Sequence, residues 1–230
     1  MTQIQHLPYR FDDPEVKCAQ YEERWKEVAI EACQSLFPRS GAAVLDFGAG
    51  RGELSGALAA AGFRVTAVDS DPECVRLTSQ YCLCHLASTP DELRKLFDEE
   101  SFDVVVALHV LEHLRDPLAY LDSLKALTRR YLILGVPNLG TMTRICFRRI
   151  VDVNRGHLQG WDYPTFYNFL TAHGGLSVLR SVQDLVVMPK LSNLLHRLKL
   201  RRLFEEHILP RLFPYQTNSV IALCEKRKAG

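Results

Sequence analysis

The sequence contains no apolar stretch long enough to cross a bilayer. The longest nearly uncharged run covers residues 131–142, whereas a spanning helix needs about 20 apolar residues. The chain begins with polar residues instead of the apolar core of a signal segment. It also lacks internal repeats and low-complexity linkers, so we expect its 230 residues to form a single domain in the cytoplasm.

The cysteines lack the paired spacing of a zinc site. Cys82, Cys84 and His85 lie close together, but no CxxC pair elsewhere in the sequence completes a tetrahedral set. The seven cysteines are an odd number, and most lie among apolar residues, where a reduced thiol acts as a small hydrophobic side chain. We therefore expect no metal.

Positive charge is concentrated in the second half of the sequence, although the net charge is only +1. Residues 144–155 hold four arginines against one aspartate, and residues 190–214 hold six lysines and arginines against two glutamates. Such segments form a solvated face, attract an anionic small molecule or an acidic membrane surface, or contact RNA phosphates. The leucines between the charges favour a lid or a membrane-surface helix over residues 190–213, and we expect no nucleic-acid partner.

Residues 44–54 carry the strongest motif. An apolar run gives way to Gly48, Gly50 and Gly52, and apolar residues at helical spacing follow. This order predicts a strand, a tight turn and the start of a helix. Glycines let the backbone approach a ligand closely, and the exposed N–H groups at a helix start favour a polar or anionic group.

An acidic residue follows at the distance expected for a nucleoside-binding unit. Asp69 ends the next apolar run, where a carboxylate takes ribose hydroxyls. The third glycine, Gly52, comes too early for the G-x-G-x-x-G pattern of a dinucleotide site, and no Tyr-x-x-x-Lys pair is present, which argues against a nicotinamide-dependent oxidoreductase. Asp46 stands two positions before the first glycine. The stretch thus resembles motif I of the class I S-adenosylmethionine-dependent methyltransferases, and Asp69 resembles their motif II acid.

This resemblance implies an α/β, Rossmann-like fold with a seven-stranded, mostly parallel sheet. Helices would cover both faces, the last strand would be antiparallel, a helical insertion would follow strand five, and a basic helical segment would precede the last strand. Residues 1–40 would form a helical cap, residues 41–140 the cofactor-binding core, and residues 141–230 the acceptor side and the rest of the sheet. The cap helix should begin at Asp13-Pro14, with Tyr21 as its candidate cofactor contact. The other cofactor contacts would be Asp46, Gly48, Ala49, Gly50, Gly52, Asp69, Ser70, Ala87, Ser88, Leu108 and His109.

A second resemblance follows the fourth predicted strand. Residues 102–108 have the continuous apolar pattern of a buried parallel strand and run into His109, Glu112 and His113. The stretch is similar to the one after strand four in many small-molecule methyltransferases. Ligands of open α/β sheets bind at the carboxyl ends of strands, so these side chains should lie near the cofactor.

Three histidines are candidates for a general base. A histidine titrates near neutral pH and so suits proton removal from an acceptor hydroxyl or amine. His109 and His157 are the candidates for the cavity, whereas His113 is the candidate for holding the loop. A structural hydrogen bond or solvent exposure is the commoner role for each of them.

The acceptor side is expected after the fifth predicted strand. The resemblance puts Asn138 toward the substrate cavity, and Trp161 and Tyr163 could wall an aromatic or lipid-like acceptor. Phe166 and Tyr167 are further candidates, although most of these four aromatic side chains should pack under the insertion.

These observations favour methyl transfer from S-adenosylmethionine to a small molecule, at oxygen by family frequency, by in-line displacement and without a metal. The acceptor could be anionic or lipid-like, and residues 190–213 could contact a membrane surface. Residues 130–170 also resemble, less closely, the methionine biosynthesis protein W family, from which the long tail departs. That likeness suggests an alternative, a catalytically silent methyltransferase-like protein that binds a partner enzyme.

Overall fold

The computed structural model describes residues 19–39, 41–142, 145 and 156–227. Its strands are β1 (Ala43–Phe47), β2 (Arg64–Asp69), β3 (Leu83–Leu86), β4 (Phe102–Leu108), β5 (Thr128–Pro137), β6 (Leu176–Val182) and β7 (Ser219–Lys226). Its α-helices are α1 (Ala19–Leu36), α2 (Glu53–Ala60), α3 (Pro72–Thr78), α4 (Pro90–Leu96), α5 (Pro117–Leu127), α7 (Tyr163–Asn168), α8 (Pro189–Arg197) and α9 (Leu209–Leu212). A 3-10 turn covers Leu111–His113, and π-helical turns cover Phe169–His173 and Leu203–Ile208.

The seven strands form one sheet with the order β3-β2-β1-β4-β5-β7-β6. Strands β1 to β5 pair in parallel, and β7 runs antiparallel between β5 and β6. The predicted seven-stranded, mostly parallel sheet with an antiparallel last strand is therefore confirmed. The strand order reverses between β1 and β4, and ligands of open α/β sheets bind at such a switch point.

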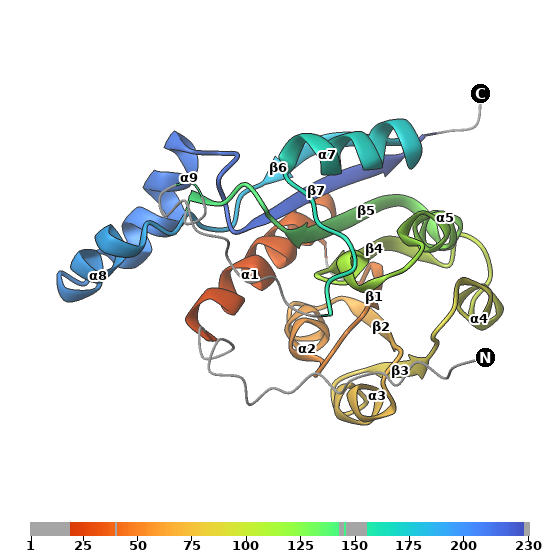
Figure 1. Cartoon of the computed structure of the whole chain (residues 1–230). Helices are drawn as coiled ribbons and strands as arrows, with labels where there is room; N and C mark the ends of the chain where they lie inside the picture. Colours follow the sequence, from red (N-terminus) through yellow and green to blue (C-terminus); the bar gives the residue numbers. More distant parts are fainter. Residues whose placement is uncertain (1–18, 40, 143–144, 146–155, 228–230) are drawn as a thin grey trace.

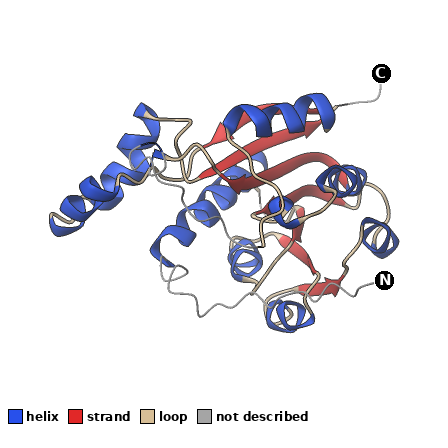
Figure 2. Ribbon diagram, viewed as in Figure 1, coloured by secondary structure: helices blue, strands red, loops and turns tan. Residues whose placement is uncertain are grey.

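Helices cover both faces of the sheet (Figures 1 and 2). Alternate residues of the central strands point to opposite faces, as strand geometry requires. Val105 and Leu132 pack with α4, α5 and α7, whereas Val104 and Ile133 pack with α1 and α2. This burial on both faces explains why the central strands have continuous apolar sequences.

Four helices begin at capping side chains that can be recognised in the sequence. Asp71, Thr89 and Asp116 each accept a hydrogen bond from a backbone N–H two or three residues later, and each is followed directly by proline. Helix α7 begins with a reciprocal capping box between Asp162 and Thr165. These caps fix where α3, α4 and α5 leave the strands before them.

Strand β6 ends at Val182, although the apolar pattern predicts a strand over residues 176–187. The Val186 N–H bonds to a backbone carbonyl of the Leu203–Ile208 turn, and the Leu185 carbonyl accepts from the residue before β7. The chain thus leaves the β6–β7 ladder to pack against the C-terminal helices. The helix predicted over residues 72–81 also ends early, at Thr78, in a pair of tight turns.

The predicted basic helical segment before the last strand is present as α8, the Leu203–Ile208 turn and α9. Helix α8 extends away from the sheet (Figure 1). Most of the basic stretch at residues 144–155, the predicted helix start at Asp13-Pro14 and the side chain of Tyr21 lie outside the described part. Among the residues described, no helix combines the length and the hydropathy needed to cross a membrane.

Candidate active site

The glycine turn between β1 and α2 adopts a backbone that side chains disfavour. Gly48, Gly50 and Gly52 have φ angles of 78°, 56° and 81°. A Cβ on Gly48 would lie 2.2 Å from a methyl group of Val110, and a Cβ on Gly52 would lie 2.8 Å from the Thr78 Cα. A Cβ on Gly50 would meet nothing within 4 Å. Packing thus explains two of the glycines, whereas Gly50 faces open space that a ligand can enter.

Asp69, at the end of β2, lies directly beside this turn. Its carboxylate accepts hydrogen bonds from the Gly50 N–H, at 2.7 Å, and from the Asp71 N–H, at 2.9 Å. Burial raises the pKa of Asp69, and the backbone donors oppose that rise because they favour the charged form. Two motifs that are separate in the sequence therefore meet, as a nucleoside site requires.

Asp46 supports the turn from inside the protein. Its side chain is 2% exposed and accepts a hydrogen bond of 2.5 Å from the Ser55 hydroxyl in α2. Burial raises the pKa of Asp46 to about 6. The carboxyl group thus joins β1 to the first turn of α2 behind the glycines.

The segment after β3 lies next to Asp69. The Ala87 N–H donates to the Asp69 backbone carbonyl at 3.0 Å, which puts Ala87 and Ser88 at the same edge of the sheet. The Ser88 carbonyl accepts from the Tyr120 hydroxyl at 2.6 Å. Ser70 is exposed beside them. Ser70, Ala87 and Ser88 thus lie beside Asp69, where the sequence resemblance predicts contacts with the nucleoside.

His109, directly after β4, is held by elements from three parts of the chain. Its φ of 56° is unusual for a residue with a side chain, and its N–H donates to the Gly135 carbonyl at 2.8 Å. Its Nε2 lies 3.1 Å from the Ser219 hydroxyl, and its ring packs on Trp25 with 5.2 Å between the centroids. Helix α1 and strand β7 therefore both orient this imidazole.

The predicted histidines converge on Glu112, a buried carboxyl group. Glu112 is 1% exposed, and neither of its carboxylate oxygens has a hydrogen-bond partner among the described residues. Its Oε1 lies 3.7 Å from His109 Nδ1, 3.9 Å from His113 Nε2 and 4.0 Å from His157 Nε2. The cluster joins the segment after β4 to the loop after β5, and its donors could share a proton or a cation.

Burial sets the charge of this cluster. It raises the pKa of Glu112 to about 8 and lowers the pKa of His109 to about 4, with further lowering by His157 and His113. It also lowers the pKa of His113, although a hydrogen bond to the Gly156 carbonyl opposes that shift. Without a bound ion, the favoured state at neutral pH is therefore a protonated Glu112 carboxyl beside the neutral imidazoles of His109 and His113.

Comparison with known proteins identifies the family. A model described as a methyltransferase domain matches residues 20–207. The chain belongs to the class I S-adenosylmethionine-dependent methyltransferases. The family predicted from the sequence is thereby confirmed.

Relatives and structural neighbours agree with this assignment. Ubiquinone biosynthesis O-methyltransferases from Haemophilus ducreyi and Xylella fastidiosa are 38% and 34% identical over 113 and 101 residues, which cover 45% and 42% of this chain. The chain matches less than half of their own length, 47% and 41%.

Solved methyltransferase structures show the same fold. A Synechocystis magnesium protoporphyrin IX methyltransferase with bound S-adenosylhomocysteine has a TM-score of 0.61 at 18% identity, over 90% of this chain and 84% of its own. A Thermotoga maritima S-adenosylmethionine-dependent methyltransferase has a TM-score of 0.66 at 14% identity, over 95% and 97%.

The methyltransferase buries two of its predicted acceptor residues. Asn138 is 3% exposed, and its amide donates to the Tyr215 and Thr217 carbonyls while its oxygen accepts from Gly140. Trp161 is 8% exposed and packs on the rings of Phe166, in α7, and Phe169, in the π-helical turn that follows. Both side chains therefore hold the loops after β5 and do not face open space.

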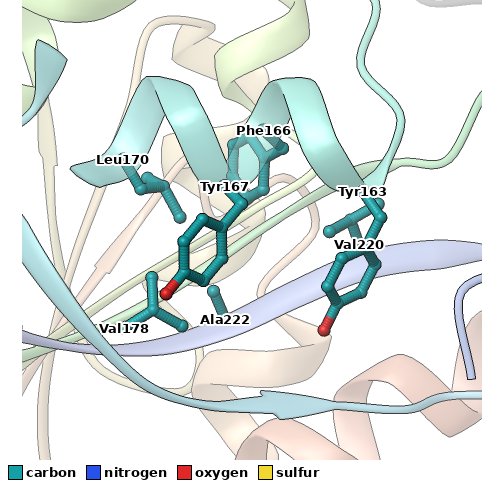
Figure 3. Close-up of a pocket in the computed structure, with 7 residues that line it drawn as sticks. All are labelled: Tyr163, Phe166, Tyr167, Leu170, Val178, Val220 and Ala222. Atoms are coloured by element: carbon teal, nitrogen blue, oxygen red, sulfur yellow. The ribbon is translucent and has the colours of Figure 1, made fainter. Parts of the chain in front are cut away.

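The other aromatic candidates lie around a small apolar hollow (Figure 3). It is lined by Tyr163, Phe166, Tyr167, Leu170, Val178, Val220 and Ala222, from α7, β6 and β7 and the π-helical turn after α7. These strands stand at the opposite end of the sheet order from β2 and β3. Phe166 is fully buried, whereas Tyr167 is 48% exposed. The hollow is separate from the glycine turn and from Glu112.

The sequence predicts that Glu112 lies near the cofactor but gives it no role, and it does not indicate Trp25 or Ser219 as site residues. A signal for Glu112 was available, because His109-x-x-Glu112-His113 spaces two histidines four residues apart around a carboxylate within an apolar stretch. The prediction of no metal was based on the cysteines and did not take the pair His109 and His113 into account. No local pattern marks Ser219, which reaches the site only because β7 inserts beside β5.

Alanine at Gly48 and at Gly50 should affect the protein differently. Gly48→Ala places its Cβ into Val110, so we expect the free energy of unfolding to fall by about 2–4 kcal/mol. Gly50→Ala meets no protein atom and should cost only about 1 kcal/mol for its left-handed backbone. It should still weaken S-adenosylhomocysteine binding at least tenfold. Urea denaturation and calorimetry check both, and unchanged binding by Gly50→Ala would contradict a ligand at this turn.

The buried Asp46 should make stability depend on pH. Its pKa rises from 3.8 to about 6 on folding, so its favourable contribution is complete below pH 3.8 and is lost as the pH rises toward 6. The shift corresponds to about 3 kcal/mol. Urea denaturation at pH 4 and pH 7 should show a smaller loss of stability in Asp46→Asn than in the parent. Equal pH slopes for the two proteins would refute the assignment.

Proposed function

We propose that this methyltransferase transfers a methyl group from S-adenosylmethionine to the oxygen of a small-molecule acceptor. The observation that carries the proposal is the junction of the Gly50 N–H with the Asp69 carboxylate beside the open face of the glycine turn. The partial likeness to O-methyltransferases supports oxygen as the methylated atom.

The cofactor, when bound, supplies a methyl group on a positively charged sulfur that leaves as a neutral thioether. The acceptor oxygen forms its bond to the methyl carbon as the carbon–sulfur bond breaks in line with it. The protein's main contribution is to hold both reactants in near-attack geometry, which can supply roughly 7–11 kcal/mol in well-oriented reactions. In this chain, Gly48, Gly50 and Asp69 would hold the donor.

His109 would take the proton of the acceptor hydroxyl. It directly follows β4 at the switch point, and Trp25 and Ser219 hold its ring. His113 would position the loop, because its Nδ1 lies 3.1 Å from the Gly156 carbonyl. His157, on that loop, would complete the acceptor side of the site.

An apolar or lipid-like acceptor would suit the C-terminal helices. Leu194, on α8, and Leu198, directly after the end of α8, are 54% and 56% exposed. Arg197 and Lys199 stand exposed beside them. Exposed leucines with neighbouring cations favour contact with an anionic membrane surface, from which such an acceptor could enter.

Calorimetry and a transfer assay test the proposed reaction. The parent protein should bind S-adenosylmethionine and S-adenosylhomocysteine, and Asp69→Ala should bind at least tenfold more weakly, whereas Asp91→Ala, an exposed acid on α4, should bind like the parent. With a panel of phenols and alcohols as acceptors, His109→Gln should lower kcat by about 10²-fold, a larger factor than any change in the Kd of S-adenosylhomocysteine.

Absence of cofactor binding by the parent protein would refute methyl transfer. Cofactor binding without turnover on any acceptor, together with a stable complex with a second enzyme in pull-downs, would instead support the catalytically silent alternative.

Membrane contact is tested by sedimentation with vesicles. Vesicles with about 30% phosphatidylglycerol should carry down the parent protein, and neutral vesicles should not, because the basic residues favour an anionic surface. Replacing Leu194 and Leu198 with aspartate should reduce the bound fraction at least tenfold. Leu83→Asp, at the exposed β3 edge, is the matched control and should bind like the parent. Equal binding of all three proteins would exclude α8 as the contact.

A further inference from the structure

Glu112, His113 and His157 form a cluster that methyl transfer by itself does not need. Their donor atoms lie within 4.8 Å of one another, at the carboxyl end of β4. We infer that a divalent transition-metal ion binds between these three side chains. The inference rests on the proposed function only for the role of the ion, not for its site.

The spacing of the donors is close to that of a metal site. Glu112 Oε1 lies 3.9 Å from His113 Nε2 and 4.0 Å from His157 Nε2. Metal–ligand bonds of about 2.0–2.2 Å put neighbouring donors of a tetrahedral site about 3.4 Å apart. The two pairs that include Glu112 therefore need a contraction of about half an ångström. The two imidazole donors, which lie within 4.8 Å of each other, need one of up to about 1.4 Å, which rotation of the His113 and His157 side chains supplies.

The buried carboxylate lacks what a cation would supply. Both oxygens of Glu112 are without a hydrogen-bond partner among the described residues, and the side chain is 1% exposed. A buried polar group without a partner destabilises the folded protein, and more so when it is charged. A bound cation satisfies this carboxylate directly, which the surrounding imidazoles do not do at 3.7–4.0 Å.

Backbone groups orient two of the donors as metal sites require. His113 Nδ1 lies 3.1 Å from the Gly156 carbonyl, an arrangement in which Nδ1–H donates and the Nε2 lone pair points toward Glu112. The Leu158 and Gln159 N–H groups both donate to the Glu112 carbonyl, at 2.7 and 3.0 Å. These bonds hold the loop against the 3-10 turn and thereby present His157 to the carboxylate.

The chemistry of the three donor groups indicates which ions would bind and what a bound ion would do. Two imidazoles and one carboxylate favour Zn²⁺, Co²⁺, Mn²⁺ or Fe²⁺ over Mg²⁺ and Ca²⁺, which prefer all-oxygen sites. Three protein ligands leave a position open, as in catalytic sites. An acceptor oxygen bound there would lose its proton more readily, since divalent ions strongly lower the pKa of bound hydroxyl groups.

Proton removal from the acceptor and methyl transfer to its oxygen need neither an oxidant nor a reductant. The acceptor O–H bond breaks, and its proton passes to His109, which stands next to Glu112. The oxygen then forms the bond to the methyl carbon, while the carbon–sulfur electron pair leaves with sulfur. The ion keeps its charge throughout.

Titration with Co²⁺ tests the site without relying on activity. The metal-free parent protein should bind one equivalent and develop visible d–d absorption of low-symmetry Co²⁺, and Zn²⁺ should displace it. Glu112→Gln, nearly isosteric, and His157→Ala should each bind Co²⁺ at least tenfold more weakly. His173→Ala removes an exposed histidine at the end of the π-helical turn after α7 and should bind like the parent.

Calorimetry with S-adenosylhomocysteine, run on every variant, separates loss of the ion site from loss of the fold. A parent protein that gives no Co²⁺ spectrum, or variants that bind Co²⁺ as well as the parent, would overturn the inference and leave only a proton-sharing cluster. Metal binding without methyl transfer would instead remove the proposed function and keep the site. Transfer that is undiminished after removal of the metal would refute its role in deprotonating the acceptor.

Discussion

The hydrogen bond from the Gly50 N–H to the Asp69 carboxylate is the contact on which the cofactor side depends. It joins the turn after β1 to the end of β2, and the Gly48 and Ala49 N–H groups add two bonds to the Val68 carbonyl. Parallel pairing brings these strand ends to one edge, but it does not bend the turn. The turn is bent by three residues at positive φ, two of which have no room for a side chain. Asp46 and Ser55 secure the same turn from behind, so the ligand-facing backbone is fixed on both sides.

Elements from distant parts of the chain meet at His109. Its ring contacts Trp25 from the first described helix, Ser219 from the last strand and Glu112 from its own segment. The similarity to ubiquinone biosynthesis O-methyltransferases covers less than half of this chain, whereas the common fold covers nearly all of it. The fold is therefore shared more widely than the sequence, and in such folds specificity is carried by loops and helices added to the common sheet.

The strands, the glycine turn and the helix caps could be predicted because each depends on neighbouring residues. Residues 102–108 are buried on both faces of the sheet, and their continuous apolar sequence predicts that burial. Asp116-Pro117 predicts where α5 begins, because aspartate is a favoured N-cap and proline a favoured first helical residue. The cluster around Glu112 could be predicted only in part, since His157 joins it through loop hydrogen bonds that no local pattern encodes. Asn138 and Trp161 looked like cavity residues, yet the backbone carbonyls and aromatic rings that bury them come from distant segments.

The insertion of β7 between β5 and β6 has a consequence for how the site is made during synthesis. Strand β6 leaves the ribosome before β7, and it has no partner in the sheet until β7 arrives, because it pairs with no other described strand. Until then β5 presents an open edge, a state in which chains are prone to associate with one another. Ser219 arrives on that same strand and then lies against His109. The same strand, β7, covers the open edge of β5 and brings Ser219 to His109. A nascent chain therefore completes this site only when that edge is covered.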